Sequence, residues 1–231
     1  MELLEANALA RDPASGQLLP CLRDRLLIRM LYRNGLRVGE GVAIGVDDLN
    51  LDQAEMRIVH LKQRVRLYCH ECGSRLARSH RFCPGCQREV TEAERRIQET
   101  RRQRVLPLDG DTVKLLRQYI SLEGPVMKDG RLMVFGITEN RARQIVKDAA
   151  DRAGLGPLLN TETGRAMGIS PHRLRDAFAT RAVGIDGSLE GVRQLQELLG
   201  HEHINTTMRY VKLTGQQQRE YFDKLWEEEE K

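Results

Sequence analysis

The spacing of four cysteines constrains this chain more than any other feature, because it fixes which backbone segments have to meet. They lie in two pairs with two residues inside each pair: Cys69, Cys72, Cys83 and Cys86. That gap lets both sulfurs of a pair reach one ion, and Gly73 and Gly85 are expected to permit the tight turns. Four thiolates complete a tetrahedral shell that suits structural zinc, although iron of the rubredoxin type satisfies the same pattern. The pattern predicts an inserted zinc-ribbon module over residues 66–100.

The composition is that of an ordinary soluble globular protein, with 40% hydrophobic and 30% charged residues. The chain of 231 residues can bury a full core as one large domain or as two small ones. No apolar run approaches the roughly 18 residues of a membrane span, and residues 1–10 lack the regions of a signal peptide. We therefore expect a cytosolic protein with no membrane partner, whose reduced thiols bind metal rather than form disulfides.

Positive charge is concentrated in one part of the chain. The formal net charge is only +4, but residues 62–104 contain twelve lysines and arginines and five glutamates, which gives +7 there and −3 elsewhere. A strongly basic segment in a nearly neutral protein indicates a polyanion partner, although a solvated surface loop or a protein contact has the same composition. The candidate DNA-binding residues are Arg75, Arg78, Arg81, Arg101 and Arg102.

Hydrophobic periodicity predicts an α+β fold that is mainly helical, with a small antiparallel sheet. Residues 1–21 read as a loosely ordered lead-in, because Pro13, Gly16 and Pro20 interrupt any pattern. Residues 22–231 are expected to form the main domain, with the cysteine module inserted into it. Residues 56–61 and 104–108 are short and rich in alternating or β-branched residues, so both are predicted to be strands.

Helices are predicted on both sides of the strands. One begins at Leu22 and ends at Asn34-Gly35, and Ser170-Pro171 and Ser188 are good helix starts. Gly200 is expected to end the helix that Ser188 begins. The remaining predicted helices cover residues 113–120, residues 145–153 and a final segment opened by Thr214-x-x-Gln217 with Phe222, Leu225 and Trp226 on one face.

Three separate motifs carry the indication of function. They are N-G-L-R-V-G-E at residues 34–40, H-R-L-R-D-A-F-A-T at residues 172–180, and L-L-G-H at residues 198–201 with Tyr210 nine residues later. Each alone has an ordinary explanation, such as a surface arginine or a core aromatic residue. Together and in this order they resemble the tyrosine recombinase family (lambda-integrase-like, with phage, archaeal and Xer-type members). The resemblance covers roughly residues 22–215 and is interrupted by the cysteine module.

The resemblance implies a set of catalytic roles that make physical sense. Arg37 and Arg175 would grip the two non-bridging oxygens of a phosphodiester, where negative charge builds up during in-line attack. His172 would accept the proton of the Tyr210 nucleophile, because a phenol of pKa about 10 is mostly protonated at neutral pH. His201 would donate a further hydrogen bond to the phosphate.

The family also has a lysine on the sheet hairpin that protonates the leaving 5′-oxygen. Lys62 ends the first predicted strand and is the only lysine before Lys114, so it takes that role by position and by elimination. Glu40 is expected to support Arg37 by a hydrogen bond. The implied reaction forms a 3′-phosphotyrosyl intermediate at Tyr210 and needs neither a nucleotide cofactor nor a catalytic metal. The implied partners are double-stranded DNA and further copies of the chain, as a tetramer on DNA.

Two features depart from the family pattern. Relatives normally carry an N-terminal DNA-clamping domain, which about twenty residues cannot form, so it is expected to be absent from this chain or removed from it. The cysteine module replaces a short turn.

Site-specific recombination or integration is the favoured hypothesis, because L-G-H and the apolar face near Trp226 suit assembly of subunits. Strand relaxation of the type IB topoisomerase kind and a non-catalytic zinc-ribbon DNA-binding protein are the alternatives. Exchange between two duplexes, as against relaxation alone, would distinguish the first two.

Overall fold

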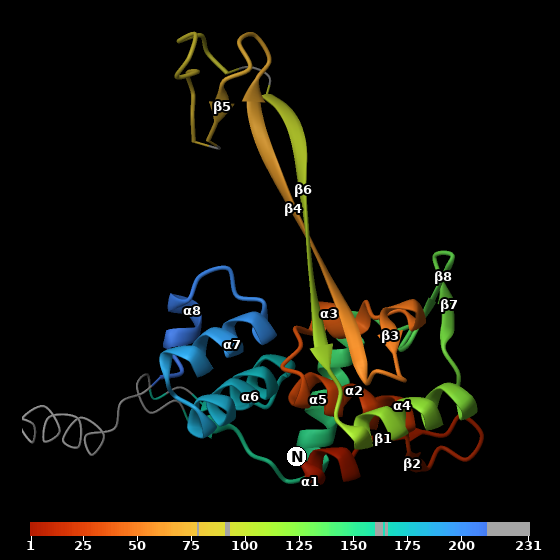
Figure 1. Cartoon of the computed structure of the whole chain (residues 1–231). Helices are drawn as coiled ribbons and strands as arrows, with labels where there is room; N and C mark the ends of the chain where they lie inside the picture. Colours follow the sequence, from red (N-terminus) through yellow and green to blue (C-terminus); the bar gives the residue numbers. More distant parts are fainter. Residues whose placement is uncertain (78, 91–92, 160–163, 165, 212–231) are drawn as a thin grey trace, which may run out of the picture. The chain divides into compact units, whose positions relative to one another are not determined.

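The computed structural model describes residues 1–77, 79–90, 93–159, 164 and 166–211, with the backbone alone at residues 60–66, 93–102 and 158. The chain divides into two compact units, one made of Met1–Arg57 with Arg104–Lys231 and the other of Ile58–Gln103 (Figure 1). The predicted final helix and its apolar face lie outside the described residues. The module boundaries at residues 66 and 100 remain a prediction.

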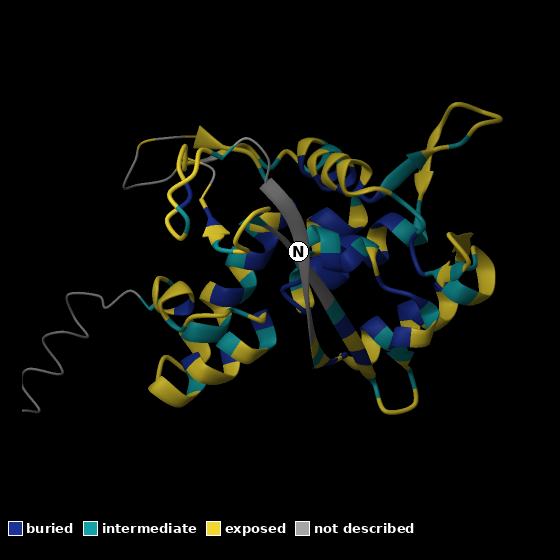
Figure 2. Ribbon diagram, turned by 90° about the horizontal axis from the view of Figure 1, so that it is seen from above, coloured by how far each residue is buried: buried dark blue, intermediate teal, exposed yellow. Residues whose placement is uncertain are grey.

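Helix α2 (Leu22–Arg33) is the central element of the first unit. Leu26, Leu27 and Ile28 are completely buried, as are Met30 and Leu31, so the helix is covered almost all round. It contacts α1 (Glu2–Ala6), α4 (Gly110–Leu122) and α6 (Pro171–Ile185), and Figure 2 shows buried residues in dark blue on the helices of this unit. The other helices are α3 (Val38–Val42), η1 (Val46–Asp48), α5 (Glu139–Arg152), α7 (Leu189–Leu199) and α8 (Asn205–Met208).

The predicted helix ends are confirmed where polar and glycine residues mark them. Ser170 caps α6 by accepting a hydrogen bond from the backbone nitrogen of Arg173, with Pro171 in the first helical position. Ser188 caps α7 in the same way, and Gly200 ends it in the left-handed conformation with φ +63°. These ends fix where the motif residues on α6 and α7 lie.

The prediction of a loosely ordered lead-in over residues 1–20 is wrong. Strands β1 (Leu9–Arg11) and β2 (Leu18–Pro20) form a hairpin after α1, with Gly16 in its turn at φ +70°. Leu4 is buried, and the buried Glu5 carboxylate pairs with Arg29 of α2 at 3.1 Å. The proline and glycine spacing marks a hairpin turn here, and the buried ion pair that holds the segment is not visible in composition.

The strands are longer than predicted. Strand β4 (Glu55–Cys69) contains the first predicted strand, and β6 (Ala93–Pro107), which pairs with β4, contains most of the second. In the first unit β3 (Leu49–Asn50) pairs with the start of β4, where Met56 is buried. In the second unit β5 (Arg75–Leu76) pairs with the end of β4. Strand β4 keeps apolar residues at alternate positions beyond the predicted end, at Val59, Leu61, Val65 and Leu67, with one interruption at Gln63. The first part of β6 is almost entirely polar, so it lacks the period-two hydrophobic pattern on which strand prediction depends.

Two further short hairpins complete the described elements. They are β7 (Val126–Lys128) with β8 (Arg131–Met133), and β9 (Leu158–Leu159) with β10 (Ala166–Met167). Across the described ranges of the chain, no helix combines the length and the apolar character needed to cross a membrane.

Candidate active site and metal centre

The turn that ends α7 is the point at which the three sequence motifs meet. Arg37, just before α3, donates from Nη1 to the Leu199 carbonyl and from Nη2 to the Gly200 carbonyl, both at 3.4 Å. Arg175 on α6 donates from Nη2 to the same Leu199 oxygen at 2.7 Å and from Nη1 to the Gly35 oxygen at 2.5 Å. Residues far apart in sequence therefore place two guanidinium groups side by side.

Glu40 holds one of these arginines in place, as expected from the sequence. Its buried carboxylate accepts from Arg37 Nη1 at 2.8 Å and from the Arg37 backbone nitrogen at 2.9 Å. Burial tends to raise the pKa of Glu40, but hydrogen bonds and charge from Arg104 and Arg37 outweigh it and lower the pKa to about 2. The carboxylate is therefore ionised throughout the neutral range.

Arg104 is a site residue that sequence reasoning missed. It donates to both Glu40 oxygens, at 3.0 and 2.8 Å, and its Nε donates to the Leu198 carbonyl at 3.0 Å. The bidentate contact fixes the carboxylate together with Arg37. Arg104 and Glu40 are 64 residues apart, so no local pattern in the sequence could have paired them.

Two glycines allow the close packing at this point. Gly35 has φ +57°, and a Cβ atom there would lie 2.5 Å from Cδ1 of Phe178. Gly200 has φ +63°, and a Cβ atom there would lie 2.6 Å from Nη1 of Arg104. Both positions need the left-handed backbone and the missing side chain at once.

The site is electropositive. Burial and the neighbouring charge of Arg37 lower the pKa of Arg175 to about 10, which still leaves it protonated at neutral pH. Arg37, Arg104 and Arg175 share the Glu40 carboxylate, so positive charge exceeds negative charge in this partly buried place and the guanidinium groups repel one another. A phosphate with two free oxygens has the charge and the shape to relieve that repulsion.

His201 follows the turn and is neutral at pH 7. Burial and the charges of Arg175 and Arg37 lower its pKa to about 4. Its Nδ1 lies 2.8 Å from the hydroxyl of the buried Thr207. With Thr207 donating to Nδ1, the other ring nitrogen carries the proton and can donate to a phosphate oxygen.

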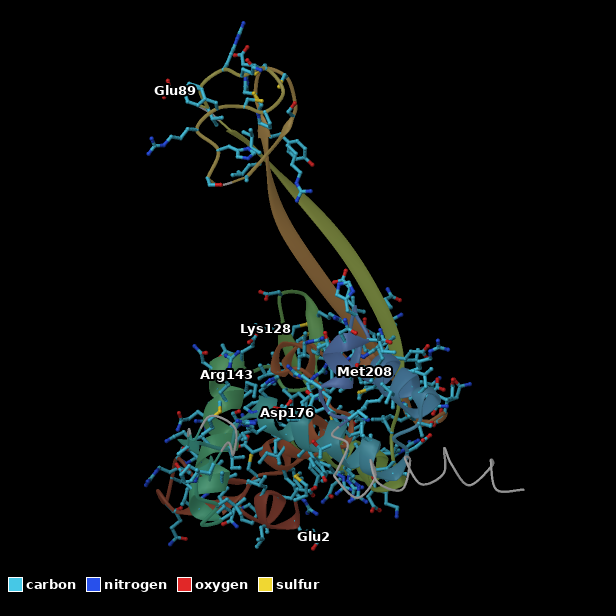
Figure 3. All side chains as sticks on the ribbon, turned by 90° about the vertical axis from the view of Figure 1, so that its left-hand side faces the viewer. Glu2, Glu89, Lys128, Arg143, Asp176 and Met208 are labelled. Carbon is cyan, nitrogen blue, oxygen red and sulfur yellow. The ribbon has the colours of Figure 1, made fainter. Side chains whose placement is uncertain are left out.

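Tyr210 lies just after α8, half-buried against a small cluster formed by Ala179, Leu195 and Leu199. Its hydroxyl donates to Asp176 Oδ1 at 2.6 Å and accepts from Arg209 Nη2 at 2.8 Å. Burial and the Asp176 hydrogen bond raise the pKa of Tyr210. Figure 3 labels Asp176 on α6 and Met208 on α8, the two helices that bracket this contact.

The last two predicted catalytic residues are placed differently. His172 is exposed on α6, and its Nε2 lies 3.8 Å from Asp176 Oδ2. Lys62 lies on β4 in the second unit, and its side chain is outside the described residues. The structure thus brings Arg37, Arg175 and His201 together, leaves Tyr210 docked on α6, and does not place Lys62.

The four cysteine sulfurs form one cluster in the second unit. All four lie within 4.8 Å of one another, with Cys72 and Cys83 sulfurs 3.4 Å apart and Cys69 and Cys86 sulfurs 3.8 Å apart. Zinc–sulfur bonds of about 2.3 Å in a tetrahedron put the sulfurs about 3.8 Å apart. The observed donor set fits one zinc ion.

The two cysteine pairs lie in turns of the same kind. In each, the nitrogen four residues after the first cysteine donates to that cysteine's carbonyl at 2.9 Å, from Gly73 to Cys69 and from Gln87 to Cys83. Gly73 has φ +70°, but the corresponding left-handed residue of the second turn is Gln87 at φ +58°. The left-handed residue of the second turn is therefore not a glycine. Gly85 allows the close approach of the two turns, because a Cβ atom there would meet the side chain of Ser74.

Solved structures with a similar fold establish the fold class. The crystal structure of XerA recombinase matches 96% of this chain and 60% of its own chain, with a TM-score of 0.57 and 19% identity. XerH site-specific recombinase bound to difH substrate matches 95% of this chain and 51% of its own, with a TM-score of 0.55 and 18% identity. The fold is that of a tyrosine recombinase catalytic domain, as predicted.

The phage integrase family model matches residues 87–217, more than half of the chain, and the chain belongs to this family. Arg175, His201 and Tyr210 lie inside the matched range, and Arg37 and Lys62 lie before it. The predicted family resemblance is confirmed.

Curated proteins with similar sequences are also tyrosine recombinases. Tyrosine recombinase XerD of Neisseria meningitidis serogroup B is 28% identical over 200 residues, which cover 82% of this chain and 50% of the relative. Tyrosine recombinase XerC of the same organism is 27% identical over 209 residues, covering 90% of this chain and 53% of the relative. The chain spans about half the length of the curated relatives it matches.

Proposed function

We propose that this chain is a site-specific recombinase that cleaves and rejoins DNA strands through a covalent bond between Tyr210 and a 3′-phosphate. The observation that carries the proposal is the convergence of the Arg37 and Arg175 guanidinium groups on the turn at Leu199, with His201 two residues later and Tyr210 just after α8. Membership of the phage integrase family supports it. The partners are double-stranded DNA and further copies of the chain, as a tetramer on DNA in the cytoplasm.

Each group has a defined task in the proposed reaction. The Tyr210 oxygen forms a bond to phosphorus while the bond from phosphorus to the 5′-oxygen breaks. His172 takes the phenol proton, and Lys62 protonates the leaving 5′-oxygen. Arg37 and Arg175 stabilise the charge that develops on the non-bridging oxygens, and His201 donates to one of them. A 5′-hydroxyl of a second strand then attacks the phosphotyrosine and regenerates the phenol.

The cysteine cluster is proposed to hold one structural zinc ion. The four thiolates fill a tetrahedral shell, so the ion would stabilise the fold of the second unit and take no part in strand cleavage. Among the side chains that the structure describes, the buried core beside it consists of Leu76, Cys69 and Cys83. So small a core needs a metal to keep its structure. Tyrosine attack on DNA requires no catalytic metal.

The distribution of charge in the zinc-bound second unit favours a DNA contact on the paired strands rather than on the cysteine turns. In residues 67–90 four arginines oppose two glutamates, and four thiolates on Zn²⁺ add −2, so this part is formally neutral. Arg88 is also paired with Glu71 at 2.9 Å. Residues 62–66 carry +3 and residues 93–103 carry +2, and these lie on β4 and β6. Arg101 and Arg102 are therefore stronger DNA-binding candidates than Arg75, Arg78 and Arg81.

A nicked suicide substrate tests the proposed nucleophile. Such a substrate loses its 5′-hydroxyl by diffusion after cleavage, so the covalent complex accumulates and is seen on a denaturing gel. Tyr210→Phe removes one hydroxyl and opens no cavity, and we expect it to abolish the adduct. Tyr221→Phe is the matched control and should leave the adduct at the wild-type level. An undiminished adduct with Tyr210→Phe would contradict the assignment, and relaxation without exchange between duplexes would contradict recombination.

A further inference from the structure

Asp176 occupies a position between the proposed nucleophile and three basic groups. It follows Arg175 on α6, and its side chain is 21% exposed. Its carboxylate lies 3.8 Å from His172, 3.7 Å from Arg173 and 3.8 Å from Arg209. Its one short contact is with the Tyr210 hydroxyl, at 2.6 Å. Nothing in the sequence motifs assigns a task to this carboxylate.

The hydrogen bond with Asp176 holds the Tyr210 hydroxyl against α6. Its single proton is donated to Asp176, and Arg209 donates to its oxygen. The ring packs against the apolar cluster between α6 and α7. Attack on DNA requires this oxygen to face a phosphorus atom held by Arg37 and Arg175. In the described part of the chain, the hydrogen bonds of those two guanidinium groups go to Glu40 and to backbone carbonyls instead.

The contact also opposes formation of the nucleophile. A hydrogen bond from a neutral phenol to a carboxylate favours the protonated phenol. Loss of the proton would leave two negatively charged oxygens 2.6 Å apart in a half-buried place. Burial and this hydrogen bond both raise the pKa of Tyr210, and only the Arg209 contact acts in the other direction.

We propose that Asp176 is a positioning residue that holds Tyr210 docked on α6 in its protonated form, and that this hydrogen bond opens before Tyr210 attacks DNA. The inference rests on the proposed function, in which Tyr210 is the nucleophile. Opening the contact frees the phenol to give its proton to His172 at the moment of attack. Asp176 thus restrains cleavage until DNA is bound.

The rate of adduct formation tests the restraint. Asp176→Asn and Asp176→Ala in the full chain, at saturating suicide substrate, should form the adduct about tenfold faster than the wild type, since a hydrogen bond to a charged group is lost. Asp151→Asn is the matched control, because it makes the same charge change at an exposed residue of α5 that pairs with Lys147. Unchanged or slower cleavage in both Asp176 variants would overturn the proposal, since the carboxylate would then be neutral or helpful.

A second measurement needs no catalysis. Nitration by tetranitromethane in the absence of DNA, located by mass spectrometry, reports how readily each tyrosine ring reacts. Tyr210 should nitrate about tenfold faster in the Asp176 variants than in the wild type. Tyr119, which is 2% exposed, should stay unreactive and so show that the fold is intact. Unchanged Tyr210 reactivity overturns the proposal. If the wild type forms no adduct, the proposed function fails, and nitration still decides whether Asp176 restrains Tyr210.

Discussion

Glu40 is the one carboxylate around which the arginines of the candidate site are arranged. It binds Arg37 and Arg104 directly, and Arg175 lies 4.0 Å from it. Lowering its pKa from 4.5 to about 2 corresponds to about 3 kcal/mol of stability at neutral pH. Glu40→Gln should therefore lower the free energy of unfolding by about 3 kcal/mol, measured by urea denaturation at pH 7.

The pH dependence of this loss in unfolding free energy follows from the direction in which the pKa of Glu40 is shifted. Because the folded-state pKa lies below the unfolded value, the contribution is complete above pH 4.5 and disappears as the pH falls toward 2. The difference between the wild type and Glu40→Gln should shrink over that range. A difference that is constant from pH 7 to pH 3 would mean that packing, rather than charge, accounts for the destabilisation.

At the level of single residues, the sequence predicted those whose identity and order are distinctive. Arg37, Arg175 and His201 lie in short motifs, and the structure brings all three to one turn. Arg104 and Asp176 could not be found in this way. Their importance comes from contacts with Glu40 and Tyr210 across 64 and 34 residues of sequence, and such contacts exist only once the chain has folded.

Among the elements, the paired strands β4 and β6 are where the proposed DNA contact can be separated from the cysteine turns. Arg101→Gln with Arg102→Gln removes two charges from β6, and Arg75→Gln with Arg81→Gln removes two from the formally neutral part. Neutralised phosphates release counterions, so each lost contact lowers the salt slope of DNA affinity by about one.

We expect the β6 pair to lower that slope by about two and to weaken binding to all sequences alike. The Arg75 and Arg81 pair should change it by less than half as much. Fluorescence anisotropy titrations at several salt concentrations would measure both variants. If the Arg75 and Arg81 pair lowered the salt slope by an equal or larger amount, the cysteine turns would be the site of the DNA contact.

The longer helices were predictable from the sequence and the full length of the long strands was not, for a physical reason. Helices such as α6 and α7 bury one face and have a capping serine at the start, so periodicity and boundary agree. The first part of β6 is almost entirely polar, so its sequence carries no period-two pattern, and in β4 Gln63 interrupts the alternation just after the predicted end. The hairpin of β1 and β2 is not predictable in the same way, because proline and glycine are typical both of irregular segments and of turns.

For the whole molecule, the division into two units predicts two separate responses to metal removal. A strong chelator, or Cys69→Ser with Cys72→Ser, should release one zinc ion per chain and unfold the turns around it. Amide hydrogen exchange should then show lost protection in residues 67–90 and unchanged protection in α2 of the first unit. Loss of protection in α2 under the same treatment would show that the units do not fold independently.

Gly35 and Gly200 limit the amino-acid substitutions that this site can accept during evolution. A side chain at residue 35 meets the ring of Phe178, so space for it appears only if residue 178 becomes smaller in the same molecule. Reducing Phe178 first leaves a hole, and enlarging Gly35 first displaces the ring, so both single steps carry damage. At residue 200 the obstacle is Arg104, which is already bound to Glu40. Substitution at residue 35 or residue 200 is therefore expected to be accepted only together with a compensating change, so sequence variation should accumulate elsewhere in the chain.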